Sequence, residues 1–199
     1  SNHILRLNSR GQVTQSLTPD PSLGGPHGIV ELPSGDVAVA MWGASALLLV
    51  SPDGTTRLQP VADGAGHHSA LAVGGQSLFA VSDESRVTKF NMNFASPSPV
   101  HTGNPMYVAA APDGSISVSG LYAGMAYFDA SGHSWWSGIQ SPSGPAMDRS
   151  GNVFVVSNDR HELYRFDKWG QYALLRRGIP SVWSLALDSQ GQIYASTQD

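Results

Sequence analysis

The sequence PAMDRSGNVFVVSND, residues Pro145–Asp159, contains the pattern that decides the fold: an apolar stretch, a turn ending at Gly151, and a second apolar stretch. Glycine takes a positive φ without steric cost, so Ser-Gly between two alternating apolar segments predicts a β-hairpin. The continuation NDRHELYRFDKWG, which ends at Gly170, adds a third apolar stretch and a second glycine turn. We therefore expect antiparallel strands on both sides of each turn, four in all.

This pattern occurs five times along the chain. The other copies are GIVELPSGDVAVAMW (28–42), SALAVGGQSLFAVSD (69–83), YVAAAPDGSISVSG (107–120) and SLALDSQGQIYAST (184–197). Their first-turn glycines, Gly35, Gly75, Gly114, Gly151 and Gly191, are spaced by 40, 39, 37 and 40 residues. That period is the length of one four-stranded blade of a β-propeller.

The two ends of the chain complete one another. The fifth copy stops at Asp199 after two strands, and the chain opens at Ser1 with what reads as the two missing strands. Phe154–Gly170 aligns without a gap to Tyr194–Asp199 followed directly by Ser1–Gly11, over seventeen positions. The sequence thus predicts an all-β, five-bladed β-propeller of four-stranded antiparallel blades. We expect it to be closed by a blade shared between the N- and C-terminal segments, which removes exposed sheet edges.

A single domain, residues 1–199, follows from this repeat. The expected blades are 24–61, 65–101, 104–140, 141–177, and 178–199 joined to 1–18.

Composition limits the class of protein. Hydrophobic residues make up 41% and charged residues 13% of the chain, with 22 Gly and 13 Pro, which suits short strands and tight turns. The net charge is −4, and Arg176 and Arg177 form the only adjacent basic pair, so we expect no nucleic-acid partner.

No apolar run is long enough for membrane insertion. Cysteine is absent, excluding disulfides and thiolate metal sites, and the low charge favours an extracytoplasmic or secreted bacterial protein. We expect a monomer.

Two segments carry a family resemblance. NDRHELYRFDKWG (158–170) and PHGIVELPSG (26–35) resemble the NHL repeat, which occurs in six-bladed propellers. VWSLALDSQGQIYAST (182–197) is similar to propeller repeats in the sensor regions of some bacterial two-component regulators. Both resemblances imply the propeller fold, and neither implies one function.

The resemblance implies a propeller geometry. In that geometry, the start of the first strand of each blade and the loop between its second and third strands lie on the same face of the ring. Ring side chains gather there, and aromatic rings with a polar tip are common in binding surfaces. We therefore expect this face to bind a peptide, glycan or protein ligand. The candidate ligand-binding residues are Trp42, Tyr107, Tyr122, Trp183, Asn158 and Arg160. The alternative is that some of these rings pack between blades.

Histidines form a second candidate site. His27 and His67 occupy equivalent positions in neighbouring copies, and His68 follows directly. An NHL-type lyase acting on amidated peptide precursors holds zinc through histidines from different blades, so the resemblance implies a divalent metal in the channel. On a regular strand, however, adjacent residues point to opposite faces, and structural histidines are the alternative, with no cofactor.

Three hypotheses for function remain open at this point. The first is a non-catalytic ligand- or protein-binding propeller module. The second is a metal-dependent lyase or hydrolase with a histidine-lined channel, and the third is an engineered or permuted propeller without a native function of its own. No phosphate-binding loop or nucleophile motif supports other catalysis.

Overall fold

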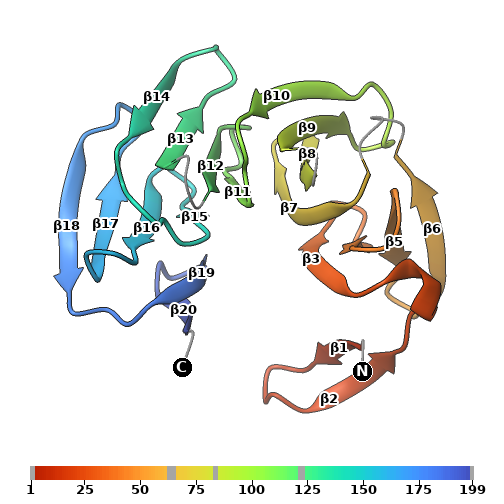
Figure 1. Cartoon of the computed structure of the whole chain (residues 1–199). Coiled ribbons are helices and arrows are strands. Elements are labelled where there is room, and N and C mark those ends of the chain that lie inside the picture. The colour runs from red at the N-terminus through yellow and green to blue at the C-terminus, as the bar shows by residue number, and fades with distance from the viewer. Residues whose placement is uncertain (1–2, 62–65, 83–84, 121–123, 198–199) are drawn as a thin grey trace.

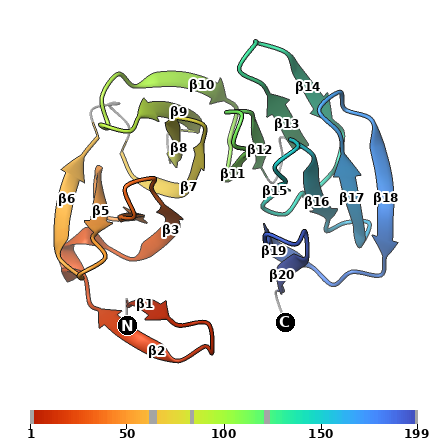
Figure 2. The same cartoon turned by 180° about the vertical axis from the view of Figure 1, so that it is seen from behind.

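The computed structural model describes residues 3–61, 66–82, 85–120 and 124–197. In that part of the chain it contains four four-stranded and two two-stranded antiparallel sheets, arranged side by side around a centre (Figures 1 and 2). The strands of each complete sheet follow one another in chain order, as in a meander. This confirms the predicted all-β class and the four-stranded antiparallel unit.

The strands have the following bounds. Sheet 1 contains β3 (Pro26–Glu31), β4 (Val37–Met41), β5 (Ala46–Val50) and β6 (Thr56–Pro60); sheet 2 contains β7 (His68–Gly74), β8 (Ser77–Ser82), β9 (Arg86–Asn91) and β10 (Ser98–Thr102). Sheet 3 contains β11 (Tyr107–Ala110), β12 (Ile116–Gly120), β13 (Gly124–Phe128) and β14 (Ser134–Ser137); sheet 4 contains β15 (Ala146–Met147), β16 (Val153–Ser157), β17 (Glu162–Phe166) and β18 (Tyr172–Arg177). The two-stranded sheets are β1 (Ile4–Leu7) with β2 (Val13–Leu17), and β19 (Val182–Leu187) with β20 (Ile193–Thr197). A short 3₁₀ turn, η1, spans Pro21–Leu23.

The hairpin turns have the geometry that the glycines predict. Gly151 has φ of 80°, and its backbone N–H donates to the carbonyl of Asp148 at 3.1 Å. Asp148 Oδ1 also accepts from the N–H groups of Ser150 and Asn152, each at 2.9 Å. The same side-chain arrangement recurs at Asp129, Asp167 and Asp188. These carboxylates are therefore used within their own turns.

Each sheet packs face to face on the next one. Buried residues of sheets 1 and 2 form one cluster around Leu47 and Phe90, and residues of sheets 3 and 4 form another around Tyr127 and Phe166. Further clusters join sheet 2 to sheet 3, sheet 4 to β19–β20, and β1–β2 to sheet 1. The core is thus a series of apolar layers between neighbouring sheets, typical of radial packing.

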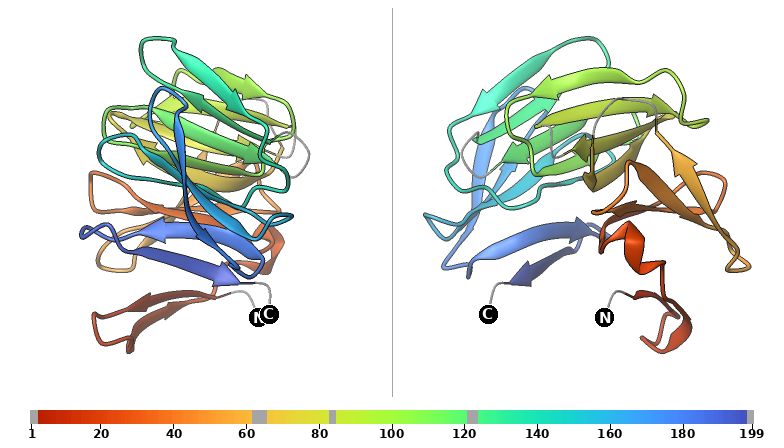
Figure 3. Two further views of the ribbon diagram at one scale, coloured as in Figure 1. Left: turned by 90° about the vertical axis from the view of Figure 1, so that its left-hand side faces the viewer. Right: turned by 45° about the vertical axis from the view of Figure 1, so that its right-hand side comes forward.

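The first strand of each sheet lies nearest the centre and the fourth lies at the rim (Figure 1). Neighbouring first strands contact one another, β3 with β7, β7 with β11, and β15 with β19. The two-stranded sheets lie on either side of an opening in the ring, with the two ends of the chain beside it (Figures 1 and 3). Within residues 4–197 no ladder joins β1 to β20. Ring closure and blade number accordingly stay predictions.

Candidate functional site

A pocket of about 800 Å³ lies where the inner strands converge, and we call it the channel pocket. His27 of β3, Trp42 after β4, Tyr107 of β11 and Trp183 of β19 all line it. The fold therefore brings together four residues that were selected from the sequence. The first and last of them, His27 and Trp183, are 156 positions apart in the chain.

Two glycines allow the inner strands to approach closely around this pocket. A Cβ on Gly28 would lie 2.9 Å from Ala70 Cα and 2.9 Å from the Ser69 carbonyl oxygen. Gly144 donates its N–H to Trp183 O at 2.7 Å and accepts from Leu185 N at 3.1 Å. The backbones of β3 and β7 therefore lie in close contact beside the pocket, and Gly144 is hydrogen-bonded to β19.

Rings form one side of the channel pocket. The imidazole of His27 stacks on the indole of Trp42, with centroids 4.9 Å apart and planes 25° apart. His67 lies on the same indole at 5.9 Å with a 54° tilt. Trp42 is 45% exposed and Trp183 is 51% exposed, so both indoles present surface to solvent. Such half-exposed rings can stack on a ligand and keep their polar edge in water.

The rest of the channel pocket is lined by polar and apolar side chains. Among the described residues, no Asp, Glu, Lys or Arg side chain lines it. Ser69, Ser82 and Ser184 line it together with Asn104 and the apolar Met106. Tyr107 is half-buried, and this burial raises the pKa of its phenol. Tyr107 therefore stays a neutral hydroxyl, able to donate or accept one hydrogen bond.

Three predicted ligand-binding residues lie elsewhere or outside the described residues. The amide of Asn158 hydrogen-bonds the backbone of Val182. Arg160 lines a different pocket, described below, and Tyr122 lies outside the described residues. The ligand-binding assignment for these three stays a prediction.

The three candidate metal ligands do not point into one place. His27 lines the channel pocket, whereas the His68 side chain is fully buried and its ring lies edge-on to Phe90 at 6.5 Å. As expected from strand alternation, His67 and His68 face different surroundings. Within the described ranges, no group of three His, Cys, Asp or Glu side chains could hold a metal ion. The residues present therefore give a three-histidine site no support.

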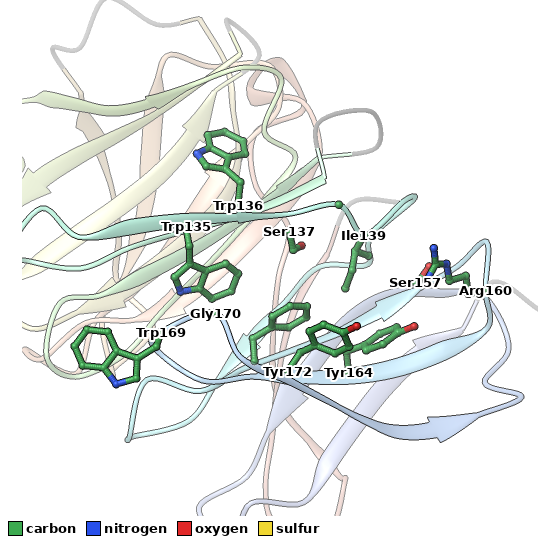
Figure 4. Close-up of a pocket in the computed structure, with 12 residues that line it drawn as sticks. Trp135, Trp136, Ser137, Ile139, Ser157, Arg160, Tyr164, Trp169, Gly170 and Tyr172 are labelled. Atoms are coloured by element: carbon green, nitrogen blue, oxygen red, sulfur yellow. The ribbon is translucent and has the colours of Figure 1, made fainter.

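A second pocket, of about 380 Å³, lies at the rim between sheets 3 and 4, and we call it the rim pocket. Trp135 and Trp136 of β14 line it together with Trp169, Tyr172 and Arg160 (Figure 4). None of these three tryptophans is among the ligand-binding residues predicted from the sequence. The signal that could have found them is the presence of aromatic residues in the rim strands of two consecutive repeats.

The geometry defines a class: sheets packed radially, first strands at the centre, form a β-propeller fold. Solved structures agree. The chain is similar to a streptogramin B lyase (TM-score 0.77, 13% identity), with 98% of this chain matching 70% of that chain. It is also similar to a chain of the nidogen/laminin complex, with a TM-score of 0.75 and 13% identity; 97% of this chain matches 80% of that chain. A third similar structure is a catalytically inactive virginiamycin B lyase from Staphylococcus aureus with quinupristin. Its TM-score is 0.71 and its identity 12%, and 92% of this chain matches 73% of that chain.

These likenesses show the fold alone. No protein-family model and no curated protein sequence matches the chain, and the NHL assignment stays a resemblance. Each of these three solved chains is longer than the part that matches. No helix of the described chain has the length and apolar character needed to cross a membrane.

Proposed function

We propose that the chain is a non-catalytic binding module whose ligand occupies the channel pocket. The observation that carries the proposal is the convergence of His27, Trp42, Tyr107 and Trp183 on one concave site of about 800 Å³. Concave sites of this volume, mostly apolar with a few placed polar groups, are the usual form of ligand pockets. His27, Tyr107 and Trp183 stand on inner strands and Trp42 is stacked on His27, so these side chains are held before the ligand arrives, which lowers the entropic cost of binding.

The lining of the channel pocket favours an uncharged, apolar peptide segment. Ile29, Met106 and Val108 offer aliphatic contacts beside the two indoles, and the serine hydroxyls can bond a peptide backbone. A glycan would use the indoles but would gain little from the aliphatic side chains. A charged ligand would lose its hydration without meeting an opposite charge in the described lining.

A phage-displayed random peptide library tests the proposal. We expect enriched peptides to be neutral and rich in apolar or aromatic residues. Their affinity should fall about tenfold or more for Trp42→Ala and for Trp183→Ala, because anchor rings carry most of the binding energy. Trp169→Ala, which changes the rim pocket, is the matched control and should leave affinity unchanged. Peptides that bind all three variants equally well, or a glycan array that yields binders where the library yields none, would overturn the proposal.

The alternative function is a metal-dependent lyase or hydrolase. One observation favours it: His27 lines the pocket of a fold that resembles streptogramin B lyase. A bound metal would supply Lewis-acid polarisation of a substrate carbonyl. Elemental analysis of protein purified without chelator or His tag, followed by titration with zinc and calcium, separates the two functions. An ion bound at one per chain, lost in His27→Ala, would favour the lyase; no bound ion and no affinity would exclude it.

We propose in addition that β19–β20 and β1–β2 are the inner and outer halves of a fifth blade. Ile4 and Leu17 pack on sheet 1, and Leu185 packs on sheet 4, so each half already covers one neighbour of the expected blade. Leu5 and Leu7 are 48% and 54% exposed, whereas Tyr164 and Phe166, their equivalents in sheet 4, are buried. Pairing β1 with β20 would bury this apolar surface, which is favourable by roughly 25 cal/mol per Å².

A further inference from the structure

The rim pocket is a built site with an aromatic wall. Trp135 stacks on Phe166 with centroids 5.3 Å apart and on Tyr127 at the same distance, with planes 22° and 6° apart. Its indole Nε1 donates to Lys168 O at 3.1 Å. Tyr172 lies 5.5 Å from Phe166 and 5.8 Å from Tyr164. Figure 4 shows the side chains of Trp135, Tyr164 and Tyr172 lining this pocket.

Parts of this wall are open to solvent. Trp169 is 62% exposed and Tyr172 is 67% exposed, whereas Phe166 and Tyr164 behind them are buried. The inner rings are thus fixed by packing, and Tyr172 presents an exposed ring, whereas the Trp169 ring is covered in part by the Lys168 ammonium at 5.1 Å and by His133 at 5.4 Å. An exposed ring that packs on fixed rings can stack on a planar ligand with little loss of side-chain entropy.

The fold itself does not require aromatic residues at these positions. Trp135 stands three residues after the turn glycine Gly132, and the same place holds Arg57 after Gly54 and Ala173 after Gly170. Tyr172 stands two residues after Gly170, where the equivalents are threonine in sheet 1 and serine in sheet 3. The aromatic residues are therefore a property of this cleft and not of the repeat.

One charged side chain lines the rim pocket among the described residues, that of Arg160. Its guanidinium interacts with the hydroxyl of Tyr164, which donates a hydrogen bond to Glu162. Glu162 also forms an ion pair with Arg177, with Nε and Oε1 3.1 Å apart. The nearby carboxylate is thus already satisfied by two partners, and the remaining charge that faces the pocket is positive.

From these observations we propose that the rim pocket binds a small planar molecule that carries one carboxylate. The exposed ring of Tyr172 packs on the planar body, and the guanidinium of Arg160, whose charge Tyr172 already senses, pairs with the carboxylate. Arginine presents two parallel N–H donors that match the two oxygens of a carboxylate. The volume of about 380 Å³ suits a ligand of one or two fused rings. This site is separate from the channel pocket and does not depend on its function.

Three probes of the same shape test the charge preference: 2-naphthoate, neutral 2-naphthylmethanol and cationic 2-naphthylmethylamine. Binding is measured by titration calorimetry and by quenching of tryptophan fluorescence. We expect naphthoate to bind about tenfold more tightly than the alcohol, and the amine to bind most weakly, because one charge-assisted bidentate pair distinguishes them. The preference for naphthoate should shrink as salt is raised, since the arginine is exposed.

Variants locate the probe. Arg160→Gln should bring naphthoate to the affinity of the alcohol and leave the alcohol unchanged, whereas Tyr172→Ala should weaken both. Arg176→Gln, an exposed arginine on β18 outside the pocket lining, is the matched control. Trp183→Ala should have no effect, which keeps this test independent of the channel pocket. Equal affinities for naphthoate and alcohol, or naphthoate binding that is unchanged in Arg160→Gln, would overturn the proposal.

Discussion

The side chain of Asn158 holds the backbone of Val182 at two points. Asn158 Nδ2 donates to Val182 O at 3.0 Å, and Asn158 Oδ1 accepts from Val182 N at 2.8 Å. Asn158 follows β16, and Val182 begins β19, so the amide joins sheet 4 to the two-stranded sheet that follows it. Val182 is 1% exposed, which means that water cannot replace these bonds without local opening.

Replacing this amide should loosen the contact between sheet 4 and β19. Asn158→Ala removes both partners of Val182, and an unsatisfied buried backbone group costs roughly 1–3 kcal/mol. We expect a loss of about that size in the free energy of unfolding measured with urea, and a smaller loss for Asn158→Asp, which keeps the acceptor. Asn93→Ala, at an exposed turn position, is the control and should change stability by less than about 0.5 kcal/mol. Equal effects at positions 158 and 93 would contradict this reading.

The inner strands should not tolerate a side chain at Gly28. A Cβ there would lie 2.9–3.0 Å from three backbone atoms of β7, so the alanine methyl must push β3 and β7 apart. We expect Gly28→Ala to destabilise the protein by about 1–3 kcal/mol in thermal or urea unfolding. Gly138→Ala is the control, because nothing lies within 4 Å of its Cβ. An alanine there should be neutral or slightly stabilising, and the same result at Gly28 would show that the strands can separate freely.

The repeat predicted much of this architecture because turn chemistry is local. Gly35, Gly114 and Gly191 have φ of 84°, 87° and 79°, and each donates its N–H to the carbonyl three residues earlier. One copy departs from the pattern: Phe94 takes the place of the second-turn glycine with φ of 59°. Its ring is 8% exposed in the layer between sheets 1 and 2, so burial offsets the strain of a left-handed backbone.

The candidate sites were less predictable, since they depend on contacts between repeats. His27 and Trp183 each stand eight residues before the first-turn glycine of their repeat, and both line the channel pocket, because equivalent residues of a radial fold meet near the centre. Asn158 occupies a loop that was expected to face the ligand, yet its amide bonds a residue 24 positions later. The stacking of Trp135 on Phe166 likewise depends on how two sheets pack, and strand periodicity within one repeat carries no information on that contact.

Burial of His101 should make the protein sensitive to mild acid. The ring is 8% exposed and lies 5.2 Å from Trp136 and 5.4 Å from Phe128, and this burial lowers the pKa of the imidazole from its ordinary value of 6.5. In the unfolded chain the ring is protonated as the pH falls through 6.5, while in the folded chain it stays neutral until a lower pH. Stability is therefore full above 6.5 and is lost as the pH falls from there towards the folded pKa.

The His101 prediction is checked with unfolding curves collected across this pH range. Wild-type protein should lose more stability on acidification than His101→Gln, whose side chain does not titrate. For each protein, the loss of stability on acidification is measured relative to that protein's own stability at neutral pH. Any packing cost of the substitution therefore cancels from the comparison. Parallel pH profiles for the two proteins would show that His101 does not titrate differently in the folded state.

Closure of the ring can be tested with pairs of cysteines, because the chain has no cysteine of its own. In sheet 4, Val155 pairs with Tyr164 and Phe154 pairs with Arg165. The alignment across the two ends makes Ala195 and Leu5 the equivalents of the first pair. If β20 and β1 form one ladder, Leu5→Cys with Ala195→Cys should form a disulfide within one chain, since directly paired residues lie close enough for it.

The matched control is Arg6→Cys with Ala195→Cys, which shifts the pairing by one residue and puts the two side chains on opposite faces. Oxidised samples are compared by non-reducing electrophoresis and intact mass. A fast-migrating monomer in the first variant only is the result expected for a closed ring of five blades. Disulfide-linked dimers would mean instead that the exposed strand β20 pairs with another molecule. If neither variant forms a disulfide, the opening between β1 and β20 is maintained. Because Leu5, Leu7 and Tyr194 are all about half exposed in the open arrangement, closure should also raise the temperature of unfolding of the oxidised form.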